Sequence, residues 1–168
     1  MTRLKLDLSE NKQEIKEEEE FKKAKGIALR ILARCSRSSK ELKERLIQKG
    51  FDSQVIERVL VFLNDRGYLN DLDYAQRLAM RLLENKKVGF ARIEAILKER
   101  GIPPEFIAAV LSQLKENYSE IKTAFQIMER RFSNFEPQRA TIKERNRVIR
   151  FLQQRGFSWE TIAQVLKK

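Results

Sequence analysis

The chain has 168 residues, 35% of them charged, a formal net charge of +11 and no histidine. Without histidine it lacks the commonest general base and metal ligand, and its one cysteine excludes an internal disulfide and argues against thiol catalysis. No apolar run reaches the roughly 20 residues that span a bilayer, and the N-terminus lacks a signal-peptide apolar region. We therefore expect a cytoplasmic, non-enzymatic and monomeric protein with no cofactor, no metal and no membrane partner.

The first 22 residues form a charged N-terminal arm. Leu4, Leu6 and Leu8 alternate with polar residues, which is strand periodicity and indicates an extended tail or an edge strand that pairs with a partner. Residues 10–25 follow as a solvated helical lead-in or a partly disordered segment. The four consecutive carboxylates of residues 17–20 would point in different directions on a helix, so they do not make a metal site.

One pattern then occurs three times along the chain. Its copies are Leu46-x-x-Lys49-Gly50-Phe51, Leu97-x-x-Arg100-Gly101-Ile102 and Leu152-x-x-Arg155-Gly156-Phe157, each followed in the same register by Ile and then Val-Leu. Self-similarity of this kind is typical of tandem arrays of one small unit. The sequence therefore predicts modules at residues 23–67, 68–117 and 118–168.

The repeated pattern has a physical explanation as a helix end. If Gly50 takes the left-handed conformation after a helix, Leu46 and Phe51 occupy the two positions that touch in a Schellman turn. Lys49 then lies in the last turn, where a cation suits the helix dipole. We interpret the signature as core and cap rather than as a binding site.

Further helix boundaries can be read between the signatures. Ser38-x-x-Glu41 before Leu42 is a capping box, Gly67 ends a helix, and Asn70 can cap the next one. Asp71 and Asp73 fit the positive end of that helix better than a catalytic pair. Cys35 is expected to be half-buried in the first module.

Charge is unevenly distributed over these modules. Residues 26–70 carry a net +4, residues 71–118 a net +1 and residues 119–168 a net +6. Two basic stripes contribute the candidate binding residues, namely Lys23, Arg30, Arg34 and Arg37 in the first module and Arg139, Lys143, Arg145, Arg147 and Arg150 in the third. Such stripes suit a phosphate backbone or an acidic protein groove, and a solvated helix face is the alternative. Tyr68, Tyr74 and Trp159 are the aromatic residues that could stack on bases.

Three motifs occur together in the order of a known family. Ser38-x-x-Glu41-Leu42, Gly67-Tyr68-Leu69-Asn70-Asp71, and Gly89-x-x-Arg92 running to Gly101 resemble the RecX family, the bacterial regulators of the RecA recombinase. The resemblance covers residues from about 26 to the C-terminus, and the third module matches only through its helix–turn–helix signature. It makes Ser38, Glu41, Leu42, Gly50, Gly67, Tyr68, Asn70, Asp71, Gly89, Arg92, Gly101 and Gly156 structural motif residues.

The resemblance implies an all-α fold of three tandem three-helix repeats in an elongated, curved array. It also implies binding in the helical groove of the RecA–DNA filament, with inhibition of ATP hydrolysis, strand exchange and coprotease activity. Family members bind DNA as well, so a stand-alone DNA-binding repeat protein is the alternative. From the charges we expect the two basic ends to grip the partner and the middle module to space them.

Overall fold

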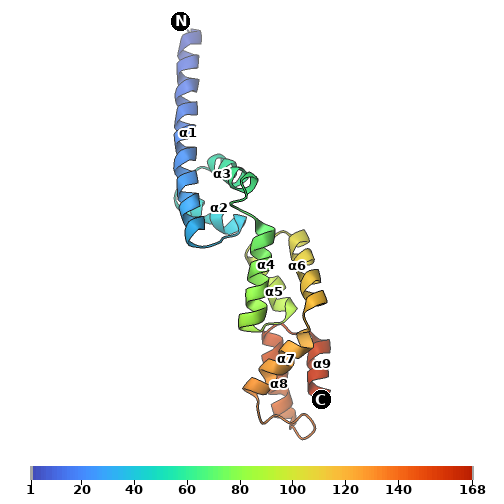
Figure 1. Cartoon of the computed structure of the whole chain (residues 1–168). Helices are drawn as coiled ribbons and strands as arrows, with labels where there is room; N and C mark the ends of the chain where they lie inside the picture. The colour runs from blue at the N-terminus through green and yellow to red at the C-terminus, as the bar shows by residue number, and fades with distance from the viewer. Residues whose placement is uncertain (1, 168) are drawn as a thin grey trace. The chain divides into compact units, whose positions relative to one another are not determined.

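The computed structural model describes the backbone of residues 2–167 and the side chains of residues 13–167, and within them every regular element is helical (Figure 1). The elements are α1 (Thr2–Arg34), α2 (Ser39–Gln48), α3 (Ser53–Asp65), α4 (Asp71–Arg81), the π-helical turn η1 (Leu82–Lys86), α5 (Phe90–Glu99), α6 (Pro104–Asn117), α7 (Glu120–Arg131), α8 (Ile142–Gln154) and α9 (Trp159–Lys167). This confirms the all-α class. None of these helices is long and apolar enough to cross a membrane.

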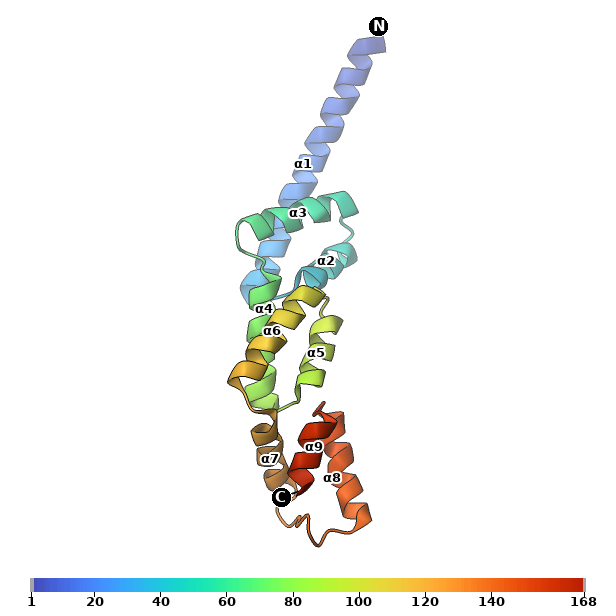
Figure 2. The same ribbon diagram turned by 90° about the vertical axis from the view of Figure 1, so that its right-hand side faces the viewer.

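The helices belong to two compact units that divide within α4, after Tyr74. The first unit contains α1, α2, α3 and the first turn of α4. The second contains the rest of α4, the next two helices and the three-helix group α7, α8 and α9 (Figure 2). The third predicted module and residues 75–117 of the second therefore share one compact unit, while residues 68–74 of the second belong to the first unit.

Helix α1 corrects the expectation for the N-terminus. It is continuous from Thr2 to Arg34, so the predicted extended tail or edge strand is wrong, and no break separates the arm from the first module. Alternation over three leucines is a short signal, whereas the surrounding Glu, Lys and Leu residues are good helix formers. Within the first unit, α1 extends well past α3 in both views (Figures 1 and 2).

The three signature turns adopt the predicted geometry. Gly50, Gly101 and Gly156 have φ values of 82°, 72° and 76°. In each copy the residue after the glycine donates its N–H to the carbonyl of the leading leucine, as from Phe51 to Leu46 at 3.3 Å. A fourth turn of this kind ends α3 at Gly67, where Tyr68 N–H donates to the Leu63 carbonyl at 2.9 Å. The Schellman interpretation is therefore confirmed.

The first unit has its own hydrophobic core. Ala24 and Ala28 of α1, Leu42 and Leu46 of α2, and four residues of α3 are buried together. Alanines on α1 let α3 approach closely. Cys35 lies outside this core and is exposed, so its predicted half-burial is wrong. It is the residue after the end of α1, beyond the last turn that packs on α3.

The third module has a second core, and the middle module lies beside it in the same unit. Ala124, Ile127 and Met128 of α7 pack with buried residues of α8 and α9. In the middle module the buried residues come from α4, α5 and α6, among them Leu78, Ile93 and Val110. Each three-helix group thus buries its apolar stripes and leaves the polar faces of its helices to solvent.

Candidate functional site

Helix α8 carries the densest part of the predicted basic surface. Its start is defined by a capping box in which Thr141 Oγ1 accepts the Glu144 N–H at 3.3 Å and the Glu144 carboxylate accepts the Thr141 N–H at 2.8 Å. The Thr141 hydroxyl also donates to Glu144, and these bonds hold the pKa of the Glu144 carboxyl below its ordinary value. The spacing Thr-x-x-Glu signals such a box, although it is not among the sequence-based predictions.

Because one face of α8 is buried, three of the predicted cations lie on its exposed face. Val148 and Leu152 are buried in the core of the third module. Lys143, Arg147 and Arg150 are exposed and follow one another at i, i+4 and i+7. The stripe predicted on this helix is therefore a real surface feature.

These cations line a groove of about 400 Å³ between α8 and the C-terminal end of α7. Its lining residues are Arg131, Phe132, Lys143, Arg147, Arg150, Phe151 and Gln154. No carboxylate lines it, and Arg131, Lys143 and Arg150 make no ion pair with another described residue. Glu144 lies in the adjoining hollow with Arg131 and Arg147, but the lining of the groove itself has four cations and no carboxylate. This excess of positive charge makes the α7–α8 groove attractive to a polyanion.

Two phenylalanines form part of the same groove. The rings of Phe132 and Phe151 meet edge to face with centroids 5.2 Å apart. The guanidinium of Arg147 lies 5.8 Å from the Phe132 centroid, and that of Arg155 lies 4.8 Å from the Phe151 centroid. Aromatic faces hold guanidinium groups by cation–π attraction, so the Phe132 ring helps to orient Arg147 in the groove, while the Phe151 ring holds Arg155 outside it.

Sequence reasoning missed part of this groove. Arg131, Phe132 and Phe151 were not among the candidate residues. The consecutive arginines at the end of α7 were the available signal for Arg131. The two phenylalanines look like core positions in sequence, and only their ring contact, which brings the end of α7 beside α8, makes them part of the groove.

Two other predicted cations of the third module are engaged locally. Arg139 pairs with Glu136 at 3.3 Å, and Arg145 donates to the carbonyl of Pro137. Both contacts tie the segment before α8 to itself. Neither residue lines the α7–α8 groove.

The predicted stripe of the first unit lies along α1. Lys23, Arg30 and Arg34 are exposed, and Arg30 Nε donates to the Gly26 carbonyl at 3.1 Å. Arg37 differs, because its guanidinium pairs with Glu41 at 3.4 Å and its side chain is only a quarter exposed. Arg37 therefore contributes to the local network and not to the exposed stripe.

In the first unit, the residues of the sequence motifs that resemble those of the RecX family form this local hydrogen-bond network. Glu41 accepts from the Ser38 N–H at 3.2 Å and from the Tyr74 hydroxyl at 2.9 Å. Asp71 accepts the Ser39 N–H at 2.8 Å, and Asn70 caps α4 by accepting the Asp73 N–H at 3.0 Å. These bonds fasten the start of α2 to the first turn of α4. Asp71 is thus a hydrogen-bond acceptor for α2, beyond its predicted match to a helix dipole.

The aromatic residues proposed for base stacking divide into two groups. Tyr74 is 7% exposed and its hydroxyl is bonded, so stacking by Tyr74 is ruled out. The predicted role was wrong because the ring faces the core while only the hydroxyl reaches the polar network. Tyr68 and Trp159 are 60% and 65% exposed, so both side chains are accessible to a partner.

Within the second unit, the middle and third modules contact each other at two of the motif glycines, Gly89 and Gly156. Gly89 N–H donates to the Arg155 carbonyl at 2.8 Å, and Arg155 in turn donates to the Lys86 carbonyl at 2.9 Å. A Cβ on Gly89 would lie 2.5 Å from the Phe157 nitrogen, and one on Gly156 would lie 2.6 Å from the Arg92 Cβ. The backbones of the middle and third modules therefore meet with no room for a side chain at either glycine.

Glu120 completes this joint. Its carboxylate accepts the Phe90 N–H at 2.8 Å, and its other oxygen accepts the Thr161 hydroxyl at 2.7 Å and the Ser158 N–H at 3.4 Å. One side chain at the start of α7 thus satisfies the first turns of α5 and α9. The joint places the α7–α8 groove on one body with the middle module.

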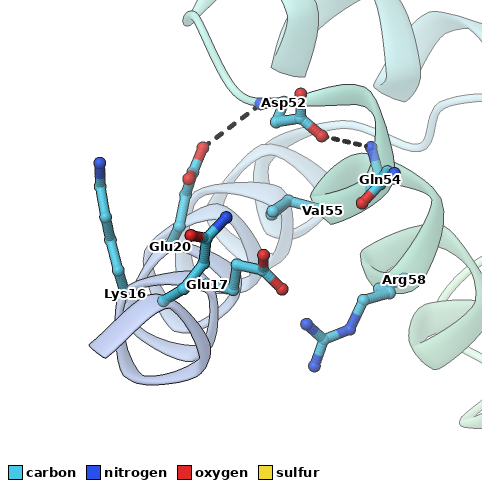
Figure 3. Close-up of a pocket in the computed structure, with 8 residues that line it drawn as sticks. Lys16, Glu17, Glu20, Asp52, Gln54, Val55 and Arg58 are labelled. Atoms are coloured by element: carbon cyan, nitrogen blue, oxygen red, sulfur yellow. Dashed lines mark hydrogen bonds between the residues drawn. The ribbon is translucent and has the colours of Figure 1, made fainter. Parts of the chain in front are cut away.

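A second cluster of cations and aromatic rings lies between α1 and α3. Phe21 and Phe62 meet edge to face at 6.1 Å, and Lys25, Arg58 and Arg66 lie within 4.8–5.3 Å of a ring centroid. The neighbouring pocket contains Glu17, Glu20 and Asp52 as well as Lys16 and Arg58 (Figure 3).

The acidic residues of α1 are partly engaged in this region. Glu20 accepts the Asp52 N–H at 3.3 Å, and Glu18 pairs with Arg58 at 3.1 Å. The charges of the α1–α3 pocket therefore compensate one another, unlike those of the α7–α8 groove. Among the described residues no three His, Cys, Asp or Glu side chains are grouped to hold a metal ion.

The sequence of this chain is similar to those of several known proteins. The model of the first three-helix domain of RecX matches residues 24–63, and the model of its third three-helix domain matches residues 119–166. The Regulatory protein RecX of Trichlorobacter lovleyi is 34% identical over 141 residues, which are 84% of this chain and 92% of that protein. The Regulatory protein RecX of Clostridioides difficile is 31% identical over 161 residues, which are 94% of this chain and 74% of that protein.

Solved structures share the fold. The crystal structure of RecX from Lactobacillus salivarius superposes with a TM-score of 0.76 at 19% identity, over 89% of this chain and 96% of that one. A second crystal structure of a regulatory protein RecX gives 0.80 at 18% identity, over 95% and 78% of the two chains. With its three-helix groups, its ordered motifs and these relatives, the chain is a member of the RecX family of regulatory proteins.

Proposed function

We propose that this protein binds the RecA–DNA filament and inhibits RecA ATP hydrolysis, strand exchange and coprotease activity. The α7–α8 groove carries the proposal, because four cations without a carboxylate among them suit the phosphates or acidic surface of such a filament. Membership of a family of regulatory proteins supports a regulator over an enzyme. A chain that contacts neighbouring protomers would oppose the subunit movements that accompany ATP turnover.

The test is the rate of RecA ATP hydrolysis on single-stranded DNA with increasing amounts of this protein. We expect the rate to fall as the amount of this protein increases. The variant with Lys143, Arg147 and Arg150 all changed to Glu should need at least about tenfold more protein, because three attractive charges become repulsive. The matched control changes Lys115, Lys122 and Lys167 to Glu, alters the net charge equally and should inhibit like the wild type. An unchanged ATPase rate with excess wild-type protein would refute the proposal.

A stand-alone DNA-binding protein is the second candidate function. The same groove supports it, since Arg and Lys side chains with nearby aromatic edges suit a single strand. It predicts DNA retention in a gel without RecA, with affinity that falls steeply with salt. If the groove variant loses inhibition of RecA but keeps DNA retention, the groove contacts protein; if it loses both, the groove contacts DNA.

A further inference from the structure

The middle module has a groove whose chemistry differs from that of the basic surfaces. It lies between α4 and α6 and has a volume of about 640 Å³. Its lining residues are Gln76, Met80, Val110, Gln113, Leu114, Asn117 and Tyr118. None of the seven is charged, although 35% of the residues in the whole chain are. We refer to it as the α4–α6 groove.

The groove has an apolar floor and a carboxamide rim. Val110 and Leu114 are buried at 2% and 3% exposure, and Met80 is half-buried beside them. On the rim, the carboxamides of Gln76 and Gln113 make no hydrogen bond with another described residue. These two side chains keep both donors and acceptors available.

The other two rim residues have different local roles. Asn117 Nδ2 donates to the backbone carbonyl of Gln113 at 2.8 Å, which leaves its oxygen as an acceptor. Tyr118 follows the last turn of α6 and is 36% exposed. The rim therefore offers polar atoms that can follow the edges of an uncharged occupant, and it offers no charge.

This composition selects one kind of partner. A phosphate backbone or an acidic peptide finds no cation in the groove, so a polyanion gains nothing there. Depletion of charge together with Met and an aromatic residue is the composition of the centre of a protein–protein interface. Met also adapts its shape to an incoming side chain. The groove therefore fits an uncharged surface of a protein.

The position of the groove within the second unit adds a second argument. Through Gly89, Gly156 and Glu120 the middle module is joined to the third module, which bears the α7–α8 groove. One compact body thus carries a neutral groove and a strongly basic groove. A partner that offers both an uncharged protein face and a polyanion can occupy both grooves at once, and linked sites bind more tightly than either alone.

We infer that the α4–α6 groove binds an uncharged helix of the protein component of a nucleoprotein filament, while the α7–α8 groove faces the anionic component. The inference rests on the proposed function, because the filament supplies both components. A helix fits because Val110 and Leu114, one turn apart on α6, form the apolar floor, and an amphipathic helix lays apolar side chains at i, i+3 or i+4, and i+7 into such a groove. The middle module then recognises the partner as well as spacing the two ends.

Charged substitutions of opposite sign at one exposed rim position test this inference. Gln113→Lys and Gln113→Glu each place a charge against the occupant. An uncharged helix is disfavoured by either sign, because the buried charge has no partner. A polyanion instead favours Lys and disfavours Glu. The control pair is Ala108→Lys and Ala108→Glu, which alters an exposed residue of the same helix that does not line the groove.

The measurement is the affinity of each variant for RecA assembled on oligo(dT) with a non-hydrolysable ATP analogue, and for oligo(dT) alone. Both Gln113 variants should bind the filament at least about tenfold more weakly, as expected for a disrupted interface centre. Both should bind oligo(dT) as the wild type does, and the Ala108 pair should match the wild type in both assays. Unchanged melting temperatures show that the exposed substitutions leave the fold intact.

Several outcomes overturn the inference and are distinct from failure of the proposed function. Effects of opposite sign at Gln113 indicate a polyanion in the groove, and unchanged filament affinity shows that the groove is not used. A concentration-dependent dimer in sedimentation that both Gln113 variants abolish assigns the groove to a second copy of this chain. If the wild-type protein itself does not bind the filament, the proposed function fails and the inference with it.

Discussion

The turns at Gly50 and Gly156 have the same sequence signature and the same local geometry, yet their surroundings differ. Both glycines have φ near 80° and both are followed by a phenylalanine that donates to the leading leucine. A Cβ on Gly50 would meet nothing within 4 Å, whereas one on Gly156 would overlap the backbone of Arg92. One motif thus ends a helix in the first unit and, in the second, also forms the joint between two modules.

The comparison shows why the third copy of the signature matters for function. The joint at Gly156 connects the basic α7–α8 groove to the middle module, and Glu120 reinforces it from the start of α7. In the first unit the corresponding fastening uses side chains, through Glu41, Tyr74 and Asp71. A backbone joint allows closer approach than a side-chain network and tolerates less change.

The largest expected effect on stability is at the two glycines that differ in their surroundings. Gly156→Ala combines left-handed strain of about 1–2 kcal/mol with a steric overlap of about 1–3 kcal/mol, so we expect a loss of roughly 2–5 kcal/mol of unfolding free energy. Gly50→Ala suffers the strain alone and should lose about 1–2 kcal/mol. Urea unfolding followed by circular dichroism measures both. Equal losses of unfolding free energy for Gly156→Ala and Gly50→Ala would show that the close contact between Gly156 and the middle module adds nothing to stability.

A smaller effect is expected at the carboxylates that cap neighbouring helices. Glu120→Ala removes the acceptor of three hydrogen bonds, and we expect a loss of about 2 kcal/mol. Asp71→Ala removes the acceptor of the Ser39 N–H in the first unit and should lose about 1 kcal/mol. Thermal unfolding of the two variants gives their order, and a larger loss for Asp71→Ala would contradict the shared role of Glu120.

The smallest effect concerns acid and the start of α8. Because the folded-state pKa of Glu144 is lowered by its bonds to Thr141, the ionised carboxylate stabilises the fold above its ordinary pKa of 4.5. That contribution is lost as the pH falls through the lowered folded value. Glu144→Gln cannot titrate, so the difference in melting temperature between it and the wild type should be largest above about pH 5 and shrink at lower pH. A difference independent of pH would contradict this account.

Much of the helical structure could be predicted from local pattern. The Schellman turns, the capping box at Ser38 and the cap at Asn70 depend on residues within one or two turns of each other, so spacing alone reveals them. The N-terminal arm was misread because three alternating leucines carry less information than the helix-forming composition around them. The burial of Tyr74 and the exposure of Cys35 depend on distant partners and could not be predicted from spacing.

The candidate site was predictable only in part for the same reason. Lys143, Arg147 and Arg150 follow from helical periodicity, which places them on one face. Arg131 and the two phenylalanines join them only because the contact between Phe132 and Phe151 brings the end of α7 beside α8. Arg37 has the same sequence spacing as a surface cation, yet the neighbouring Glu41 draws it into the network around Ser38.

The sequence by itself determined the all-helical class, the repeated helix ends and the basic character of the third module, because these depend on composition and on contacts a few residues apart. Tertiary structure alone decided that Gly156 meets Gly89, that Glu120 caps two helices, and that an uncharged groove opens between α4 and α6. Those features depend on residues 30 to 70 positions apart that meet only after the helices have packed. The physical reason is that local hydrogen bonds and periodicity are encoded in short segments, whereas close backbone approach and grooves arise from how whole helices fit together.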